Sequence, residues 1–331
     1  MTDFNSTLRI AIPSDGALHE TTLMFLRSCG IGVLRTNLRR YTAEIPALPG
    51  VTVLFQRGSD ITSKVEEGST DLGIVGHDRF LESGRENGDS IVILDKLGFG
   101  QCELVLGMPD SWVDVTSLAD LADLSMEFRE DGRTLHVATK FPRLVERFLL
   151  KNGINYFSLV QSSGTLEAAP AMGFADIIAD ISESGVTMSE NRLKTIHGGS
   201  IMTSEACLIG NLTLLKSNKE KMNKARAMAE LMEGKLSSQE FYSVTANMKG
   251  ESPEEVANYV IEHSEISGLR GPTIAKVYTS SENDWYAVTI IVEKGKLFAA
   301  VQHLRRIGGS VTVSQPDYVF DSECRVQSRL S

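Results

Sequence analysis

The sequence predicts an α/β protein with two lobes and a smaller third domain. Apolar strand-like runs alternate with helical patterns through the first two thirds of the chain, beginning with LRIAIP, LHETTLMFLRSCG, VTVLF, SDITSKVEEG and DLGIVG. This alternation is typical of α/β layers with mostly parallel strands. The length of 331 residues exceeds the usual limit of a single hydrophobic core. From about Ser238 the order becomes strand, helix, strand, strand, helix, strand, which is the ferredoxin-like arrangement.

Individual elements follow from hydrophobic spacing. A first helix is expected before Gly30, because apolar and small residues recur there at helical intervals: Leu18, Thr22, Phe25, Leu26 and Cys29. Further strands are expected from IVILDKL, CELVLGM, TLHVAT, YFSLVQ, ADIIADI and EACLIGN. Residues 109–133 are polar and acidic, and we interpret them as a connection between the lobes. Residues 215–236 predict a mixed-charge helix with a methionine and alanine stripe suited to packing between domains.

Composition excludes several classes of protein. Lys and Arg total 33 against 43 Asp and Glu, a net charge of -10, so we expect no basic field that gathers nucleic acid. No apolar run reaches the length of a membrane-spanning helix. The acidic, polar start lacks the order of a secretory signal, and a cytoplasmic location is expected. The cysteines are widely spaced, which argues against disulfides or a zinc site, and the histidines show no ligand spacing.

The segment ADIIADISESGVT at 175–187 is the main candidate for chemistry. An apolar strand runs into a turn of small hydroxyl residues, where Gly185 allows a close turn and backbone amides can converge on phosphate oxygens. Asp180 and Glu183 would repel a phosphate, but they suit ribose hydroxyls or positive charge on a sugar carbon. From the residues alone, an ordinary turn remains an equal alternative.

Three further segments carry weaker signals. QSSGTLEAAP at 161–170 repeats the strand, Ser-Gly turn and helix start, although such a turn is also an ordinary helix entry. In RGSDI at 57–61 a local salt bridge between Arg57 and Asp60 is the simpler interpretation. The basic run LRTNLRRY at 34–41 suits a phosphate or, more commonly, a solvated surface.

Taken in order, several blocks resemble the ATP phosphoribosyltransferase family of histidine biosynthesis: RGSDI, DLGIVGHD, LGFGQC, VATKFPRL, SSGTLEAAPAMGFADIIADISESGVTMSENRL and EACLIGN. The terminal blocks GPTIAKVY, WYAVTIIVEKGKL and LRRIGGSVTV look like the regulatory domain of the family's long form. The resemblance covers nearly the whole chain. It implies a two-lobed, periplasmic-binding-protein-like catalytic core and a C-terminal ferredoxin-like (ACT-like) domain. The implied boundaries are 1–108 with 189–237 for lobe I, 109–188 for lobe II and 238–331 for the regulatory domain.

The resemblance also implies a reaction. ATP attacks 5-phosphoribosyl diphosphate through adenine N1, with Mg²⁺, to give phosphoribosyl-ATP and diphosphate. The implied catalytic residues are Asp180 and Glu183. The implied residues for the phosphoribosyl donor are Ser163, Gly164, Thr165, Glu167, Ser184, Gly185, Val186 and Thr187. Those for ATP are Gly16, Ala17, Arg57, Asp71, Phe99 and Gly100. Histidine as an inhibitor and a homo-hexamer built from dimers are implied as well, whereas the metal ligands stay unknown.

One segment departs from the family's pattern. Where the family has a lysine and an arginine around the first glycine after strand one, this chain reads PSDGALHE, with Asp15 before Gly16 and Ala17 after it. Two expected phosphate-binding cations are missing there. The departure favours one alternative, a non-catalytic small-molecule sensor. A regulatory subunit that needs a catalytic partner is a second alternative, although in this family such partners normally accompany short chains without the third domain.

Overall fold

The computed structural model describes residues 6–37, 39–85, 88–161, 166–183, 185–263, 271–278, 284–306, 310–320 and 325–330. By internal contacts the chain divides into two compact units. One unit runs to Arg226 and includes Leu330, and the other begins at Ala227. Among the described residues, no helix combines the length and the apolar character needed to cross a bilayer.

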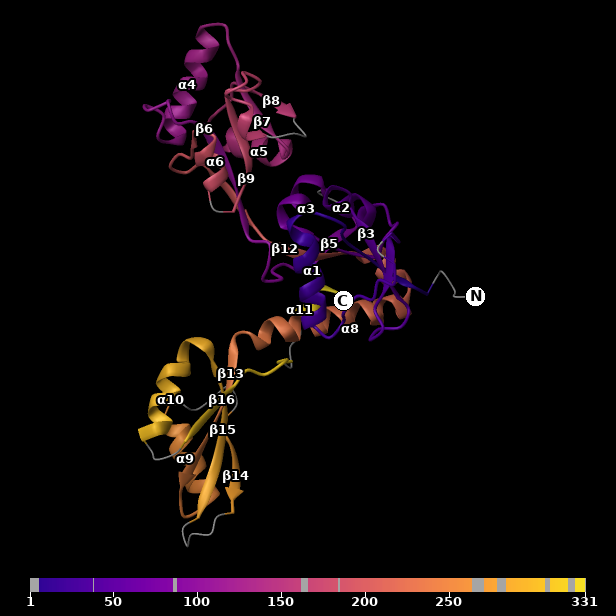
Figure 1. The fold of residues 1–331 in the computed structure, drawn as a ribbon, viewed down its shortest axis with the longest axis vertical. Helices are drawn as coiled ribbons and strands as arrows, with labels where there is room; N and C mark the ends of the chain where they lie inside the picture. The colour runs from indigo at the N-terminus through magenta and orange to yellow at the C-terminus, as the bar shows by residue number, and fades with distance from the viewer. Residues whose placement is uncertain are drawn as a thin grey trace. The chain divides into compact units, whose positions relative to one another are not determined.

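The first lobe of the larger unit is built on a six-stranded sheet (Figure 1). Across the sheet its strands are β2 (Thr42–Glu44), β3 (Val51–Gln56), β1 (Leu8–Pro13), β4 (Leu72–Gly76), β12 (Ala206–Asn211) and β5 (Ser90–Leu94). Strand β1 is parallel to both β3 and β4, whereas β12 is antiparallel to β4 and β5. The helices of this lobe are α1 (Ala17–Ser28), α2 (Gly58–Glu66), α3 (His77–Ser83) and α7 (Leu212–Ser217).

The second lobe is built on another sheet. Its strands are β10 (Leu193–Lys194), β6 (Cys102–Pro109), β9 (Ile177–Ser182), β7 (Leu135–Thr139) and β8 (Phe157–Gln161), with β11 (Ser200–Ser204) also paired to β6. Strand β7 is parallel to β8 and β9. The helices are α4 (Leu118–Glu130), α5 (Pro142–Lys151), α6 (Val186–Glu190) and the 3-10 turn η1 (Leu166–Ala168). The main core of this lobe joins one face of the sheet to α4 and α5 through Phe128, Val145 and Leu149.

The chain crosses between these lobes twice, from β5 to β6 and from β11 back to β12. Strands β6, β11 and β12 therefore run antiparallel to their neighbours, and the expectation of mostly parallel strands was wrong: both sheets are mixed. By sheet membership the second lobe runs from Cys102 to Ser204, a wider span than 109–188.

Residues 109–133 are more ordered than the sequence interpretation allowed. They contain α4, whose start is fixed by a capping box in which the Ser117 hydroxyl accepts the Asp120 N–H and the Asp120 carboxylate accepts the Ser117 N–H. Leu121 and Phe128 face the core, while the acidic residues that suggested a connection lie on the outer face. The segment is an amphipathic helix within the second lobe.

The smaller unit has the predicted β-α-β-β-α-β order. Its elements are β13 (Phe241–Lys249), α9 (Pro253–Glu262), β14 (Thr273–Val277), β15 (Trp285–Glu293), the 3-10 turn η2 (Lys294–Lys296), α10 (Leu297–Arg306) and β16 (Val311–Ser314). The antiparallel sheet has the order β14-β15-β13-β16, which is the ferredoxin-like order. Helix α8 (Lys219–Ser238) runs from the first unit into the second, and the short helix α11 (Arg325–Arg329) ends the chain.

Candidate functional site

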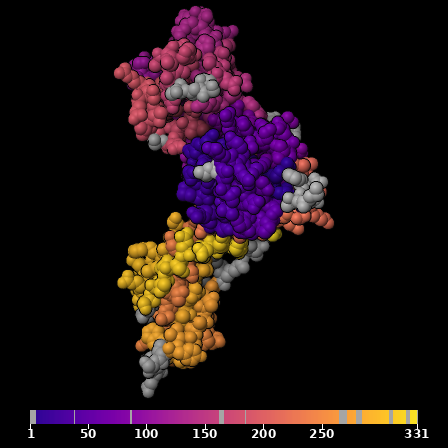
Figure 2. Space-filling model, turned by 45° about the vertical axis from the view of Figure 1, so that its right-hand side comes forward, coloured from indigo at the N-terminus to yellow at the C-terminus, as the bar shows by residue number. Residues whose placement is uncertain are grey.

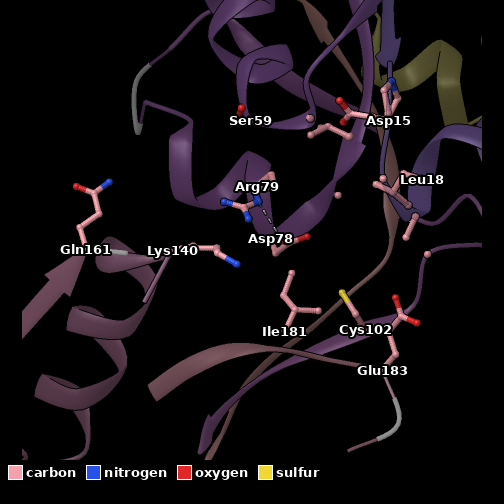
Figure 3. Close-up of a pocket in the computed structure, with 17 residues that line it drawn as sticks. Asp15, Leu18, Ser59, Asp78, Arg79, Cys102, Lys140, Gln161, Ile181 and Glu183 are labelled. Atoms are coloured by element: carbon pink, nitrogen blue, oxygen red, sulfur yellow. Dashed lines mark ion pairs between the residues drawn. The ribbon is translucent and has the colours of Figure 1, made fainter. Parts of the chain in front are cut away.

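A pocket of about 890 Å³ is lined by residues of both lobes (Figure 3). Most of its first-lobe lining comes in three groups, each just after the end of a strand. Asp15 to Leu18 follow β1, Gly58 and Ser59 follow β3, and Asp78 and Arg79 follow β4. The pocket thus lies at the carboxyl ends of three parallel strands, where open α/β sheets bind ligands.

Two helices point their N-termini at this pocket. Helix α1 begins at Ala17 after Gly16, which has a φ of 76°, a conformation that favours glycine. Helix α2 begins at Gly58 after Arg57. Within the described residues, neither helix has a side-chain hydrogen bond at its N-cap. The third amide of each helix donates to the N-cap carbonyl, His19 to Gly16 and Asp60 to Arg57. The first two amides of each helix are available to an anion, and both helix dipoles favour negative charge there.

Two cations lie in the same pocket. Arg79 of α3 has its guanidinium carbon 4.1 Å from the ring centre of Phe141 and its Nε 3.9 Å from Oδ2 of Asp78. Lys140 directly follows β7, and its Nζ lies 3.8 Å from Oδ2 of Asp180. Figure 3 shows the side chains of Lys140 and Arg79 reaching toward the same space from different lobes. Together they supply the positive charge that the turn after β1 lacks.

Asp78 links the lobes at the base of the pocket. Its side chain is nearly buried, and its Oδ1 accepts the Ser204 hydroxyl at 2.6 Å, while the Asp78 N–H donates to the same hydroxyl at 2.9 Å. The neighbouring Cys102 thiol has its pKa raised to about 11 by burial and then by the Asp78 charge. The thiol is therefore protonated at neutral pH and is a poor nucleophile.

The two predicted catalytic carboxylates lie on the second-lobe side. Burial raises the pKa of the Asp180 carboxyl. Two contacts oppose that shift: the Ile181 N–H, which donates to Oδ1 at 2.9 Å, and the charge of Lys140. The Glu167 charge adds to the rise, so Asp180, Glu167 and Lys140 are close enough to interact. Glu183 is exposed and lines the main pocket.

The predicted phosphoribosyl loop borders a second pocket of about 640 Å³, which shares Cys102 and Glu183 with the first. Gly185 lines it with a φ of 74°, and its N–H donates to the Ser182 hydroxyl at 2.9 Å. Val186 and Thr187 form the exposed first turn of α6. The predicted donor residues Ser163, Gly164, Thr165 and Ser184 lie outside the described residues.

The structure separates the predicted ATP residues. Gly16, Ala17 and Gly100 line the main pocket, and Gly100 has a φ of 69° where any Cβ would overlap the Leu18 side chain. Arg57 is exposed immediately before Gly58. Phe99 packs on Phe25, with ring centres 5.3 Å apart.

Asp71 lies elsewhere, at the amino end of β4. It is fully buried, with Oδ1 2.9 Å from Nζ of Lys221, and Oδ2 accepts the Arg9 N–H at 2.7 Å. Gly76, at the other end of the same strand, lines the pocket. We therefore assign Asp71 a structural role instead of a contact with ATP.

Sequence reasoning missed Asp78, Arg79 and Lys140. A signal for them existed, because DLGIVGHDR and LHVATK each place a charged residue directly after a buried strand. Such residues collect at the carboxyl edge of a sheet, which is where a ligand for both lobes would lie.

Comparison with known proteins agrees with this architecture. Residues 57–234 match the sequence profile of ATP phosphoribosyltransferase, and residues 238–314 match that of the HisG C-terminal domain. The chain belongs to the ATP phosphoribosyltransferase family. The resemblance seen in the sequence is confirmed, including the long form with its C-terminal domain. The family's reaction is the first step of histidine biosynthesis, and its members are transferases.

Relatives cover most of the chain. ATP phosphoribosyltransferase 1, chloroplastic, of Arabidopsis thaliana is 39% identical over 96% of this chain and 78% of its own length. The ATP phosphoribosyltransferase of Caulobacter vibrioides is 32% identical over 97% of this chain and 96% of its own.

Among solved structures, the ATP phosphoribosyl transferase (HisG:HisZ) complex from Thermotoga maritima has a TM-score of 0.51 at 23% identity, covering 69% of this chain and 99% of that chain. With the two mixed sheets and the ferredoxin-like unit, this likeness confirms the predicted fold class of a two-lobed core and a C-terminal domain.

Proposed function

We propose that this protein transfers the phosphoribosyl group of 5-phosphoribosyl diphosphate to N1 of ATP, and that the 890 Å³ pocket holds the reacting groups. The observation that carries the proposal is the convergence of two uncapped helix N-termini with Arg79 and Lys140 on one pocket. Both substrates are polyanions, and donors and cations aimed at one space can hold two of them in line. A sensor for an uncharged solute would not need positive charge from both lobes.

The second-lobe side of the pocket suits the sugar. Positive charge develops on the ribose carbon as diphosphate leaves, and the carboxylates of Asp180 and Glu183 stabilise such charge. Burial disfavours the charged form of Asp180, so positive charge beside it restores the carboxylate. We propose that Gly185, Val186 and Thr187 surround the 5-phosphate together with Ser184, and that Ser163, Gly164, Thr165 and Glu167 complete the site for the phosphoribosyl donor. In the described state the Gly185 amide is engaged by Ser182 and must turn to reach a phosphate.

The first-lobe side suits ATP. The amides that follow Gly16 and Ala17 at the start of α1 present donors to the triphosphate, and Gly100 leaves room beside them. Arg57, one residue before the pocket lining at Gly58, is within reach as a side-chain cation. Arg79 replaces part of the charge missing from the PSDGAL turn.

Mg²⁺ fits this pocket as an ion that enters with its substrate. Among the described residues, no three His, Cys, Asp or Glu side chains gather into a metal-binding group. Mg²⁺ is commonly held by one or two carboxylates with substrate phosphates and water, and Glu183 is an exposed carboxylate of the lining. Bound there, the ion would neutralise charge on the diphosphate.

We further propose that the unit from residue 238 onward binds histidine and inhibits the core, and that copies of the chain assemble as a hexamer of dimers. In support, strands β14 and β16 are the two edges of its sheet, and such edges pair readily with a second copy. The cytoplasmic location stays a prediction.

The test of the proposed activity is direct. Purified protein is mixed with ATP, Mg²⁺ and 5-phosphoribosyl diphosphate, and phosphoribosyl-ATP is followed by its absorbance. We expect product only when all three are present. Binding of either substrate without any product would favour the sensor, and product that appears only after a second protein is added would favour the regulatory subunit.

A further inference from the structure

We propose that Glu82 is a positioning residue: it holds the start of α5 and thereby sets the place of Lys140 in the pocket. The proposal rests on the proposed function, since it concerns how the second-lobe cation is brought to the substrates. Glu82 belongs to α3 of the first lobe and is 9% exposed, whereas Lys140 and α5 belong to the second lobe. The two lobes abut in the space-filling view (Figure 2).

The N-terminus of α5 depends on Glu82. The first helical residue, Pro142, has no N–H, and the Val145 N–H donates to the Phe141 carbonyl at 3.0 Å. The two remaining donors of this turn, the N–H groups of Arg143 and Leu144, both donate to the Glu82 carboxylate at 3.0 Å. A carboxylate from another lobe therefore takes the place of the N-cap side chain that α5 lacks.

The contact is reciprocal. The Arg143 guanidinium donates through Nη1 to the carbonyls of Glu82 at 2.9 Å and Gly84 at 2.6 Å, at the C-terminus of α3. An anion thus meets the positive end of α5, and a cation meets the negative end of α3. Both arrangements are favourable and both are charge-assisted, so the two helix ends form one clasp between the lobes.

The clasp acts on Lys140 through a short and rigid stretch of chain. Lys140 is two residues before Pro142, and the Thr139 hydroxyl fixes its other side by donating to the Ala179 carbonyl at 2.8 Å and accepting the Phe141 N–H at 3.0 Å. Arg79, one turn before Glu82 on α3, lies over the Phe141 ring. Helix α3 of the first lobe therefore supplies Arg79 to the pocket and also fixes the place of Lys140, because a shift of α5 would displace Lys140.

The existence of the clasp is tested by amide exchange in the full chain. In Glu82→Ala, peptides covering residues 141–147 should exchange about ten- to a hundredfold faster than in the wild type, because two charge-assisted bonds are lost. Glu146→Ala, the same change on an exposed site of α5, should leave that exchange unchanged. Equal exchange in the wild type and Glu82→Ala would overturn the clasp. Glu82→Gln keeps one acceptor and serves if the alanine variant fails to fold.

The positioning role is tested by a double-mutant cycle with Lys140→Ala. Glu82→Ala alone should raise the KM for 5-phosphoribosyl diphosphate about tenfold, with a smaller change in kcat for the bound complex, and Glu82→Gln should lie between it and the wild type. In the Lys140→Ala background the same change should have an effect below about twofold. Full additivity of the two changes would overturn the role.

The outcome separates this proposal from the proposed activity. If the wild type makes no phosphoribosyl-ATP, the proposed activity is wrong. The double-mutant cycle is then measured as the affinity of each variant for Mg²⁺-diphosphate by calorimetry. A tenfold weaker affinity in Glu82→Ala that disappears in the Lys140→Ala background would still support positioning. Unchanged diphosphate affinity in both single variants would contradict it.

Discussion

The Nζ of Lys140 lies 3.8 Å from Oδ2 of Asp180, at neighbouring strands of the second lobe. A cation and a partly buried carboxylate at this separation are attracted to each other and also limit each other's contact with solvent. In the proposed reaction they face different parts of one substrate, Lys140 the phosphates and Asp180 the sugar carbon. Their pairing without ligand keeps both side chains directed at the site.

Lys140→Ala should raise the KM for 5-phosphoribosyl diphosphate by about ten- to a hundredfold, because one charge-assisted contact to a phosphate is removed. Steady-state kinetics with varied donor at saturating ATP measure the effect. Lys151→Ala, at the exposed C-terminal end of α5, is the matched control and should behave as the wild type. A donor KM that stays constant in Lys140→Ala would remove Lys140 from the site.

Asp180→Asn should lower kcat by about a hundredfold, since a carboxylate that stabilises developing positive charge is lost.

Asp180→Asn should also raise the melting temperature at neutral pH. Burial raises the pKa of Asp180, so the folded protein binds more protons than the unfolded chain between the usual aspartate pKa and the raised one, and stability falls as the pH rises through that window.

The stabilisation by Asp180→Asn should therefore shrink as the pH is lowered from about 8 toward about 4. Melting curves of both proteins across this range provide the measurement. A stabilisation of equal size at every pH would mean that the Asp180 charge is not disfavoured by the fold.

Asp15→Lys should lower the KM for ATP by about tenfold while leaving kcat nearly constant, because it restores a cation at the start of α1. The side chain of Asp15 is exposed in the pocket lining, so the longer lysine is accommodated. Glu20→Lys makes the same charge change farther along α1 and should leave the ATP KM as it is. If neither kinetic constant responds to Asp15→Lys, ATP binds elsewhere.

Asp71→Asn should destabilise the core by about 3–5 kcal/mol, because it leaves the buried Lys221 ammonium without its partner. Lys221→Met should cost less, because Asp71 keeps its contact with the Arg9 side chain at 3.5 Å. Denaturant unfolding of the full chain reports the loss, and the ATP KM of the folded fraction should not change. Glu220→Gln, which breaks the more exposed pair with Lys224, should cost less than about 1 kcal/mol. A raised ATP KM at unchanged stability in Asp71→Asn would return Asp71 to the nucleotide site.

A chain ending at Ser238 should retain phosphoribosyl-ATP formation and lose inhibition by histidine. By linkage, an inhibitor must bind the inactive arrangement more tightly, and the proposed site for it lies beyond Ser238. Product formation with and without histidine is compared in the two proteins. Undiminished inhibition of the shortened chain would place the histidine site in the core.

Local patterns were sufficient for much of the fold. The third domain follows from alternating strands such as WYAVTIIVE and from Ser252, which caps α9 three residues after the end of β13. The direction of the strands could not be predicted from local patterns. Antiparallel β12 and β6 result from the two crossings between lobes, which are long-range events that no local spacing encodes.

The candidate site was only partly predictable. The glycines at 16 and 100 follow from the close turns that they allow, and both line the pocket. The contribution of Lys140 depends on bringing the start of α5 against α3 of another lobe, and that of Glu82 depends on a helix end more than fifty residues away in sequence. Asp71 was assigned to ATP by its motif, and only its buried contact with Lys221 assigns it to the scaffold.

The most direct test of the central claim is a crystal structure of the protein with Mg²⁺ and 5-phosphoribosyl diphosphate. The account predicts phosphate oxygens within hydrogen-bond distance of Lys140 or Arg79, in the pocket that also contains Glu183. A diphosphate bound away from this pocket, with both cations still directed at Asp180 and Asp78, would contradict it.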